Sequence, residues 1–422
     1  TNREYDMTTD IKRRDFIKTT AAAGAAVTFS ALSYSRVLGA NNRIRIAQIG
    51  CGDRGVTAHL AGIQPFTQSE NIEVIAVSDP WRQARERAIA AVKEAWGREP
   101  AAFVSHRDVL AMKEVDAVMI ASPDHLHSRQ LQDAAKAGKD AYCEKPMAKN
   151  LKELLKAYDE VKRSGILVQI GTQLRSLPTA VGCKAVYESG IFGKVSRIEQ
   201  CRNANKPYWY HYIRPVAKED VDWNEFWLGK PKVKFDSVRY SAWYGYRETC
   251  DGPVPQWGSH FLDTVHYITG ATVPVSCVCH GGTFTWKDEN QFTTPEHVQA
   301  LWIYPEDFMV SYSTNLGNDY GNSYKIYGDQ GVLKLDNLRA PVYTAEGGSK
   351  NKGVIKGVNE VAPIDHPDHF LNWLQCLRSR KQPHAPIEAG FQHSIACLMA
   401  VESFYSGRRI SYDPYQRSFK KE

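Results

Sequence analysis

The stretch that decides the fold is Arg43–Gly55, which reads RIRIAQIGCGDRG. Its first half alternates and is rich in β-branched side chains, so it predicts a strand. The strand runs directly into a G-x-G-x-x-G turn, after which a helical pattern begins. In such a turn Gly50 allows the tight bend, Gly52 lets the backbone approach a pyrophosphate, and Gly55 lets the helix pack closely on the strand. The stretch therefore predicts a dinucleotide site at a helix N-terminus, where free N–H groups favour phosphates.

A second predicted strand, Ile72–Ser78, ends at an acidic residue, Asp79. A carboxylate at this place accepts hydrogen bonds from the adenosine ribose and repels a 2′-phosphate, which favours NAD over NADP. Arg82 tempers this preference, since its guanidinium could stack on adenine or pair with a phosphate. The alternative is that Asp79 caps the helix that starts near Pro80.

The strand–helix alternation continues through Val115–Ala121, Asp140–Cys143 and Ile166–Ile170. This pattern predicts an α/β fold with a doubly wound parallel sheet, a Rossmann domain over residues 41–170. Ligands of such sheets bind at the carboxyl ends of the strands. Residues 122–127 and 144–146 lie at such ends, so we expect them to converge on the glycine-rich turn.

The pattern changes after Gly171 to longer, antiparallel-type runs. We expect residues 171–422 to form a substrate-binding and oligomerisation domain of the α+β class, with a large open mixed sheet and C-terminal helices from about residue 367. An aromatic-rich insertion precedes most of these strands. Its best candidates for a pocket rim are residues 208–212 and 243–247, whereas Trp223, Phe226 and Trp227 have core-like helical spacing.

Composition excludes several classes of protein. The 422-residue chain has a formal net charge of only +6, too mild for a dedicated nucleic-acid binder. Its nine cysteines include no CxxC pair, which argues against a disulfide scaffold or a structural zinc site. The histidine clusters match no familiar ligand spacing, so we expect no metal. Outside the N-terminus no apolar run is long enough to span a bilayer.

The N-terminus carries paired arginines, Arg13 and Arg14, followed by Phe16, Ile17 and a short apolar stretch. This order resembles a twin-arginine export signal, whose machinery moves folded proteins. We expect residues 1–40 to be a signal and linker, the twin-arginine translocation machinery to be a partner, and the mature protein to be periplasmic. The alternative is an ordinary amphipathic N-terminal helix.

Several motifs together resemble the Gfo/Idh/MocA oxidoreductase family, the relatives of glucose–fructose oxidoreductase and inositol dehydrogenase. The resemblance covers nearly the whole chain after residue 43. It rests on Gly50–Gly55, Ser122-Pro123 with His127, Glu144-Lys145-Pro146, Gly171–Gln173 with Arg175, and Gly258–His260 with Asp263. It implies hydride transfer between a sugar-like carbinol and nicotinamide, with Lys145 and His260 as the catalytic residues and a homo-dimer or tetramer as the assembly.

The resemblance fails at one position. Many members have an aspartate four residues before the catalytic histidine, where this chain has Gln256. A glutamine can hydrogen-bond a hydroxyl but cannot act as a base. The proton relay would then rest on His260 and Lys145. The departure also leaves room for an NAD-dependent glycosidase, which oxidises its sugar only transiently. A non-catalytic sugar or NAD sensor is a third possibility, against which Lys145 and His260 speak.

The expected site has two parts. The residues expected to bind a tightly held NAD are Gly50, Cys51, Gly52, Asp53, Arg54, Gly55, Asp79, Arg82, Ser122, Pro123, His127, Glu144 and Lys145. Those expected to bind the sugar are Arg175, Tyr208, Trp243, Tyr244, Arg247, Gln256, His260 and Asp263. Asp263 lies one helical turn after His260 and is expected to orient it. For Arg175 and Arg247 a surface salt bridge is an equally good interpretation.

Overall fold

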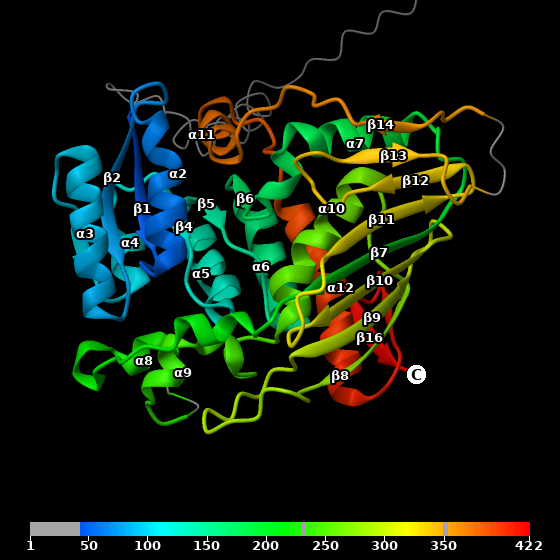
Figure 1. Cartoon of the computed structure of the whole chain (residues 1–422). Coiled ribbons are helices and arrows are strands. Elements are labelled where there is room, and N and C mark those ends of the chain that lie inside the picture. The colour runs from blue at the N-terminus through cyan, green and yellow to red at the C-terminus, as the bar shows by residue number, and fades with distance from the viewer. Residues whose placement is uncertain (1–42, 230, 232, 349–352) are drawn as a thin grey trace, which may run out of the picture.

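A computed structural model describes residues 43–229, 231, 233–348 and 353–422 (Figure 1). The twin-arginine segment lies outside these residues. The described chain forms two sheets side by side, with helices packed around and between them. No described helix has the length and apolar character needed to cross a membrane.

The first sheet has six parallel strands in the order β3-β2-β1-β4-β5-β6. The strands are β1 (Ile44–Ile49), β2 (Ile72–Ser78), β3 (Ala101–Phe103), β4 (Ala117–Ile120), β5 (Asp140–Cys143) and β6 (Val168–Ile170). The order reverses between β1 and β4, so a crevice opens there at the carboxyl ends. The predicted doubly wound Rossmann domain is confirmed.

Four α-helices connect the strands from β2 onward. They are α3 (Arg82–Trp96), α4 (His106–Ala111), α5 (Asp124–Lys136) and α6 (Leu151–Ser164). Asn150 caps α6 by accepting the Glu153 N–H, and Gly165 ends it in the left-handed region. The helix after the glycine-rich turn begins with a π-helical turn, η1 (Arg54–Leu60), and continues as α2 (Ala61–Ile63).

The second sheet has ten strands in the order β14-β13-β12-β11-β7-β10-β9-β8-β15-β16. It is mixed, because β7 and β10 pair in parallel whereas the other neighbouring strands of this order pair antiparallel. The strands are β7 (Val195–Asn203), β8 (Ser276–Gly282), β9 (His297–Ile303), β10 (Met309–Asn315), β11 (Ser323–Gly328), β12 (Gly331–Lys334), β13 (Val342–Thr344), β14 (Val358–Glu360), β15 (Ile410–Asp413) and β16 (Ser418–Lys421). This confirms the predicted α+β domain.

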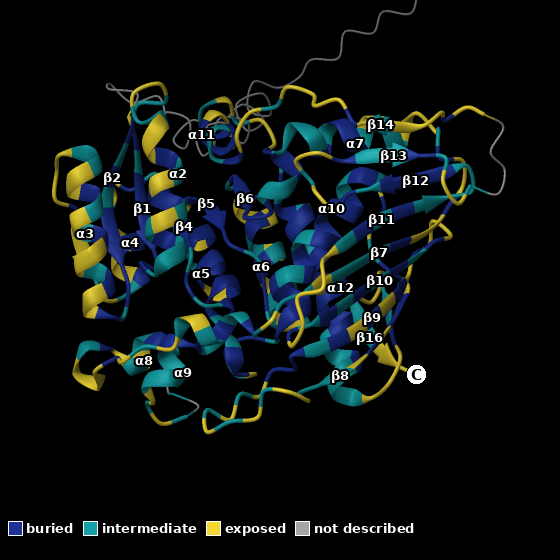
Figure 2. Ribbon diagram, in the orientation of Figure 1, coloured by how far each residue is buried: buried dark blue, intermediate teal, exposed yellow. Residues whose placement is uncertain are grey.

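One face of this sheet is covered by helices and the other is open. The covering helices include α10 (Ser259–Thr269) and α12 (Ile387–Ser406), with α7 (Pro178–Glu188) packed beside them. Strand β9 alternates buried and exposed residues, so Val298, Ala300 and Trp302 face the helices (Figure 2). On the open face Leu301 and Ile303 keep 40% and 43% of their surface accessible.

Two segments join the domains. Helix α11 (His369–Ser379) returns to the first domain, where Trp373 and Leu374 are buried in one cluster with Ile44 and Val74. The aromatic insertion runs beneath the first domain (Figure 1). We call its described residues, 204–229, 231 and 233–246, the strap. It contains η4 (Tyr208–Tyr212), η5 (Lys218–Asp220), α8 (Trp223–Phe226), α9 (Ser237–Ser241) and η6 (Trp243–Gly245).

Candidate active site

A cavity of about 310 Å³ lies at the carboxyl ends of the first sheet and is lined by the glycine-rich turn. Gly50 has φ +84°, and a Cβ there would lie 2.5 Å from the Ser122 nitrogen. A Cβ at Gly55 would lie 2.1 Å from the Gly50 oxygen, whereas at Gly52 it would meet nothing within 4 Å. Gly50 and Gly55 therefore serve backbone packing, and Gly52 faces open space. These residues fit a dinucleotide, with the diphosphate beside Gly52.

Asp79 lies in this cavity at the end of β2, as expected. Its two carboxylate oxygens accept hydrogen bonds at 2.8 Å from the backbone N–H groups of Cys51 and Trp81. Burial raises the pKa of Asp79, although both N–H bonds oppose the shift. The carboxylate thus fixes the glycine-rich turn and the start of α3, in addition to facing the cavity. The Cys51 thiol is fully buried, and burial raises its pKa well above the ordinary value.

The structure corrects the expectation for Arg82. Its side chain is 55% exposed and pairs with Asp220 of the strap at 2.6 Å and with Glu86 at 3.0 Å. It does not line the cavity. Two other arginines, Arg54 and Arg214, do line it, and Arg214 pairs with Asp53 at 3.3 Å. Arg214 could not be found from sequence because it reaches the site from the strap.

A second cavity of about 250 Å³ adjoins the first and shares Arg54, Ser122 and Tyr244 with it. Both predicted catalytic residues line this second cavity, Lys145 after β5 and His260 on α10. They come from different domains. The Lys145 Nζ donates to the backbone oxygen of Gln256 at 2.9 Å and to its side-chain Oε1 at 3.2 Å. Burial lowers the pKa of Lys145, although Glu144 and Asp124 oppose the shift.

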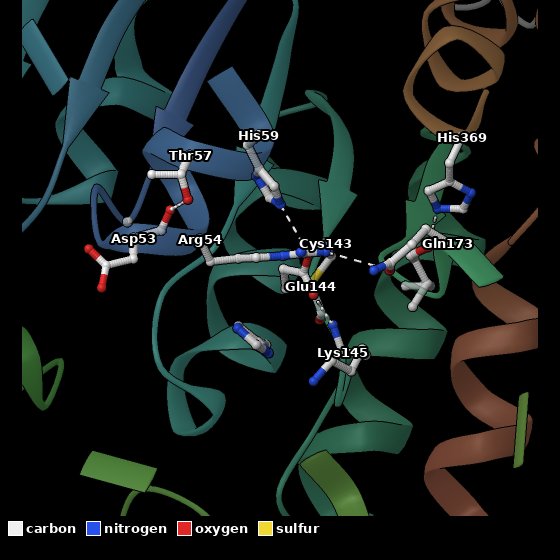
Figure 3. Close-up of polar contacts among 12 residues, drawn as sticks. Asp53, Arg54, Thr57, His59, Cys143, Glu144, Lys145, Gln173 and His369 are labelled. Atoms are coloured by element: carbon white, nitrogen blue, oxygen red, sulfur yellow. Dashed lines mark hydrogen bonds and ion pairs between the residues drawn. The ribbon is translucent and has the colours of Figure 1, made fainter. Parts of the chain in front are cut away.

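Glu144 organises the wall next to Lys145 (Figure 3). Its Oε1 accepts from the Arg54 Nε at 2.6 Å and lies 3.2 Å from the His59 Nε2, and Arg54 also reaches Gln173 at 3.5 Å. Burial alone would raise the pKa of Glu144, but Arg54 and His59 hold it well below its usual range. The residue is therefore a permanent anion that positions Arg54 between the two cavities.

His260 is half-buried and faces the second cavity. Burial, and then the Lys145 ammonium, lowers its pKa to about 3. The imidazole is therefore neutral near pH 7 and can accept a proton. Its Nδ1 has no hydrogen-bond partner among the described residues. His127 also lines this cavity, with its ring nitrogens 2.8 Å and 2.6 Å from the Pro146 and Ser122 carbonyl oxygens.

Three of the expected substrate residues lie elsewhere. Arg175 and Asp263 form a buried two-point ion pair, with nitrogen–oxygen distances of 2.9 Å and 2.6 Å. Neither lines a cavity beside Lys145, and Asp263 does not bond to His260. The His393 Nδ1 lies 3.6 Å from the Asp263 Oδ1. Arg247 is exposed and stacks on Tyr405 at 3.5 Å. These contacts correct the assignment of all three residues to the sugar site.

Aromatic side chains form the remaining wall of the second cavity. Tyr208, Tyr212, Trp243, Tyr244 and Trp257 line it. Trp243 stacks on Tyr244 with ring centroids 3.7 Å apart, and Tyr208 meets Trp257 at 4.7 Å. The buried Tyr208 hydroxyl has no hydrogen-bond partner in the described part of the chain. Flat apolar rings beside a few polar groups suit the C–H faces and hydroxyls of a sugar.

The site also contains a carboxylate that sequence reasoning missed. Asp124, the first residue of α5, lines the second cavity and is only 2% exposed. Its Oδ2 accepts a hydrogen bond from the Gln256 side-chain amide. The sequence signal was its place in Ser122-Pro123-Asp124, directly at a strand end. Across residues 43–422, apart from the six undescribed positions, no three metal-ligating side chains come together.

Comparison with known proteins agrees with this geometry. Residues 44–172 match an oxidoreductase family's NAD-binding Rossmann fold, residues 221–412 match the same family's C-terminal α/β domain, and residues 10–30 match a twin-arginine translocation signal sequence. The WlbA dehydrogenase of Bordetella pertussis, solved with NADH and UDP-GlcNAcA, superposes with a TM-score of 0.66 at 20% identity, over 88% of this chain and 99% of that one.

Two curated relatives show the range of activities nearby. Inositol 2-dehydrogenase 1 of Saccharopolyspora erythraea is 34% identical over 36% of this chain and 43% of its own length. A glycosyl hydrolase family 109 protein of a Shewanella species is 29% identical over 34% of this chain and 35% of its own. The chain thus spans less than half the length of either relative. Both of its domains and their shared cavity nevertheless place this chain in the Gfo/Idh/MocA oxidoreductase family.

Proposed function

We propose that the protein is an NAD-dependent oxidoreductase that transfers hydride between a hydroxyl-bearing carbon of a sugar or glycoside and nicotinamide. The observation that carries the proposal is that Lys145 and a neutral His260 line one cavity, which adjoins the dinucleotide cavity. Bound NAD supplies the hydride acceptor. The cofactor residues proposed for it are those of the glycine-rich turn with Asp79, Arg54 and Ser122.

The proposed chemistry needs a proton acceptor and a cation at the reacting hydroxyl. His260, kept neutral by burial, takes the hydroxyl proton. Lys145 hydrogen-bonds the same oxygen and stabilises the negative charge that develops on it as hydride leaves. The Gln256 acceptors hold the ammonium in place, and Glu144 holds the Arg54 guanidinium by pairing with it.

The substrate class follows from the aromatic wall. Tyr208, Trp243 and Tyr244 line the same cavity as Lys145 and His260. Inositol 2-dehydrogenase 1 is named for a cyclic polyol and the WlbA dehydrogenase was solved with a sugar nucleotide. A polyhydroxylated ring is therefore the proposed substrate.

The direct test is absorbance at 340 nm. Purified protein with NAD and a panel of free sugars, inositols and glycosides should form NADH with at least one of them. No NADH with any of the panel, while NAD binds, would contradict the dehydrogenase proposal.

A glycosidase is the second candidate, favoured by Gln256 in place of a carboxylate and by the family 109 relative. In that case the sugar would give its hydride to the bound cofactor only transiently. Elimination would break the glycosidic bond, water would add to the resulting double bond, and the hydride would return to the sugar. Cleavage of aryl glycosides that requires NAD, without net NADH, would support it. Tight binding of NAD and sugar with neither activity would indicate a sensor.

We also propose that the cofactor is retained. The strap crosses the outer end of the dinucleotide cavity: Val221 pairs with Trp81, and Glu225 accepts from the Ser105 hydroxyl at 2.8 Å. Phe226 and Tyr240 line the cavity itself. A strap that is bound to the first domain at two places slows the exchange of the cofactor. Slow exchange suits a periplasmic enzyme, which has no free NAD pool. Mass spectrometry of the ligand released from native protein tests this.

The open face of the ten-stranded sheet is the proposed contact between copies of the chain. Exposed apolar side chains on it include Val278, Leu301 and Ile303. Apolar surface on a sheet face favours a covering partner. Light scattering should give the mass of a dimer or tetramer, and Leu301→Lys should lower it.

A further inference from the structure

We infer that Asp124 is a positioning residue, whose negative charge acts on Lys145 through the side chain of Gln256. It thereby supplies, from the first domain, the carboxylate that is missing at position 256. The catalytic consequence rests on the proposed function, whereas the charge coupling between the two residues does not.

The three side chains form a chain of hydrogen bonds. The Gln256 Nε2 donates to the Asp124 Oδ2, and the Gln256 Oε1 accepts from the Lys145 Nζ at 3.2 Å. An ammonium only donates and a carboxylate only accepts, so these two neighbours fix which way the amide points. Asp124 and Gln256 are 2% and 5% exposed, so water competes little for these bonds.

The other carboxylates near these three side chains already have cationic partners. Glu144 is paired with Arg54 at 2.6 Å, and Asp251 is paired with Lys149 at 3.3 Å. Asp124 has no such direct ion pair among the described residues, and its carboxylate accepts a hydrogen bond from Gln256. A buried charge needs compensation. Asp124 and Lys145 therefore compensate each other across the amide.

Other titratable groups face the pair. Burial raises the pKa of Asp124, whereas His127, Lys145, the Gln256 bond and Lys149 oppose the shift and favour the carboxylate. Arg54, Glu144 and Cys250 act on Lys145, which in turn acts on His260. The Tyr208 and Tyr244 phenols, whose pKa values burial raises well above the ordinary value, also face Asp124. The Asp124 charge also raises the pKa values of Cys250 and Asp251. The variants below leave all of these neighbours in place, so the Lys145 pKa is compared within one set of surroundings.

The amide link has a chemical consequence. A carboxylate at position 256 would itself compete for the substrate proton. Here the negative charge of Asp124 stabilises the Lys145 ammonium. The group in contact with that ammonium is the Gln256 amide, which does not titrate. The hydroxyl proton is then left to His260.

The test moves the negative charge from position 124 to position 256. Asp124→Asn keeps the shape and removes the charge, and Asp124→Asn with Gln256→Glu restores one carboxylate, now beside Lys145. The readout independent of catalysis is the pKa of Lys145, measured from the pH dependence of its acetylation by acetic anhydride with peptide mass spectrometry. The second readout is the pH profile of kcat with the sugar found above.

We expect Asp124→Asn to lower the pKa of Lys145 by about one unit or more, the size of a nearby opposite charge. The alkaline limb of kcat should move to lower pH by the same amount, with NAD affinity changed less than threefold. The double variant, Asp124→Asn with Gln256→Glu, should return both the Lys145 pKa and the alkaline limb of kcat toward the wild-type values. A Lys145 pKa that is unchanged in Asp124→Asn would overturn the inference, as would a folded double variant without recovery.

Two controls separate other causes. If Asp124→Asn does not fold, Gln256→Met breaks the link while keeping both charges, and it should uncouple Lys145 in the same direction; an unchanged Lys145 pKa there also overturns the inference. If no sugar is turned over, the proposed function fails, but the acetylation measurement still decides the coupling.

Discussion

Gly52 and Gly55 occupy similar places in one motif yet serve different purposes. A Cβ at Gly52 meets nothing within 4 Å, whereas a Cβ at Gly55 would lie 2.1 Å from the Gly50 oxygen. We expect Gly52→Ala to change the free energy of unfolding by less than about 1 kcal/mol and to weaken NAD binding at least tenfold. Gly55→Ala should destabilise the fold by about 1–3 kcal/mol. Urea unfolding and NAD titration check this, and equal loss of stability in both variants would contradict it.

Lys145 is the residue on which turnover should depend most. We expect Lys145→Met to lower kcat by about 10²–10⁴-fold, the usual size of such a contribution, with NAD affinity within about threefold of wild type. Stopped-flow measurement of NADH formation and NAD titration provide the two values. Lys156→Met is the matched control, because that side chain is 51% exposed on α6. Undiminished turnover in Lys145→Met would remove its assigned role.

Among single residues, sequence reasoning located those whose place is set by a local pattern. The glycine-rich turn, Asp79 and Lys145 follow strand ends, and strand ends of a parallel sheet meet at one edge. It did not find the Arg175–Asp263 pair or the Asp124–Gln256 bond, because each joins residues far apart in the chain. Residue type alone does not say whether a buried arginine meets a sugar or an aspartate.

Among the elements, η3 (Gln173–Ser176) and α10 are joined by the Arg175–Asp263 pair. Removing one member leaves a buried charge alone. We expect Arg175→Met to lower the free energy of unfolding by about 3–5 kcal/mol. Arg175→Met with Asp263→Leu should cost less than the single change. Denaturant unfolding measures both. A single variant of normal stability with a raised KM would instead return Arg175 to the sugar site.

The strap should control how fast the cofactor leaves. Glu225 accepts from Ser105, and its carboxylate lies 3.4 Å from the His106 Nδ1. Loss of such part-buried bonds costs about 1–3 kcal/mol, so Glu225→Ala should speed NADH release by about fivefold or more. Fluorescence of bound NADH after mixing with excess NAD measures the rate. Glu86→Ala, which removes a 57% exposed carboxylate, should leave the rate unchanged.

Most elements were predictable because their patterns are long. Strands β2 and β5 begin and end where the sequence predicts. Strands β13 and β14, three residues each, are too short to show an alternation of their own. The aromatic insertion was visible as composition, but its seat against Trp81 and Ser105 depends on contacts across the two domains.

For the whole molecule, buried histidines should make the fold sensitive to acid. Burial lowers the pKa of His266 to about 3 and of His369 to about 4. Their unfolded pKa is about 6.5, so between these values the unfolded chain binds more protons. Stability is therefore lost as the pH falls below about 6.5. Asp251, whose pKa burial raises to about 6, has the opposite sign and offsets part of this loss.

We expect the free energy of unfolding to fall by roughly 1–2 kcal/mol for each such histidine between pH 6.5 and pH 5. Urea unfolding at pH 7, 6 and 5 measures the slope. His266→Gln removes one titrating group and should flatten it. Equal stability at pH 7 and pH 5 would contradict the assignment of these histidines as neutral in the folded state.

Two cavity-lining side chains sit on π-helical turns, Arg54 on η1 and Gln256 on η7 (Val254–Gly258). A π turn holds one residue more than an α turn. Deleting one residue from η7 would keep His260 in place but rotate Gln256 by about 100° around the helix axis. Insertion or deletion of one residue in either turn can thus change which side chains line the cavity, while both sheets keep their register. A scan of point substitutions would not sample such changes.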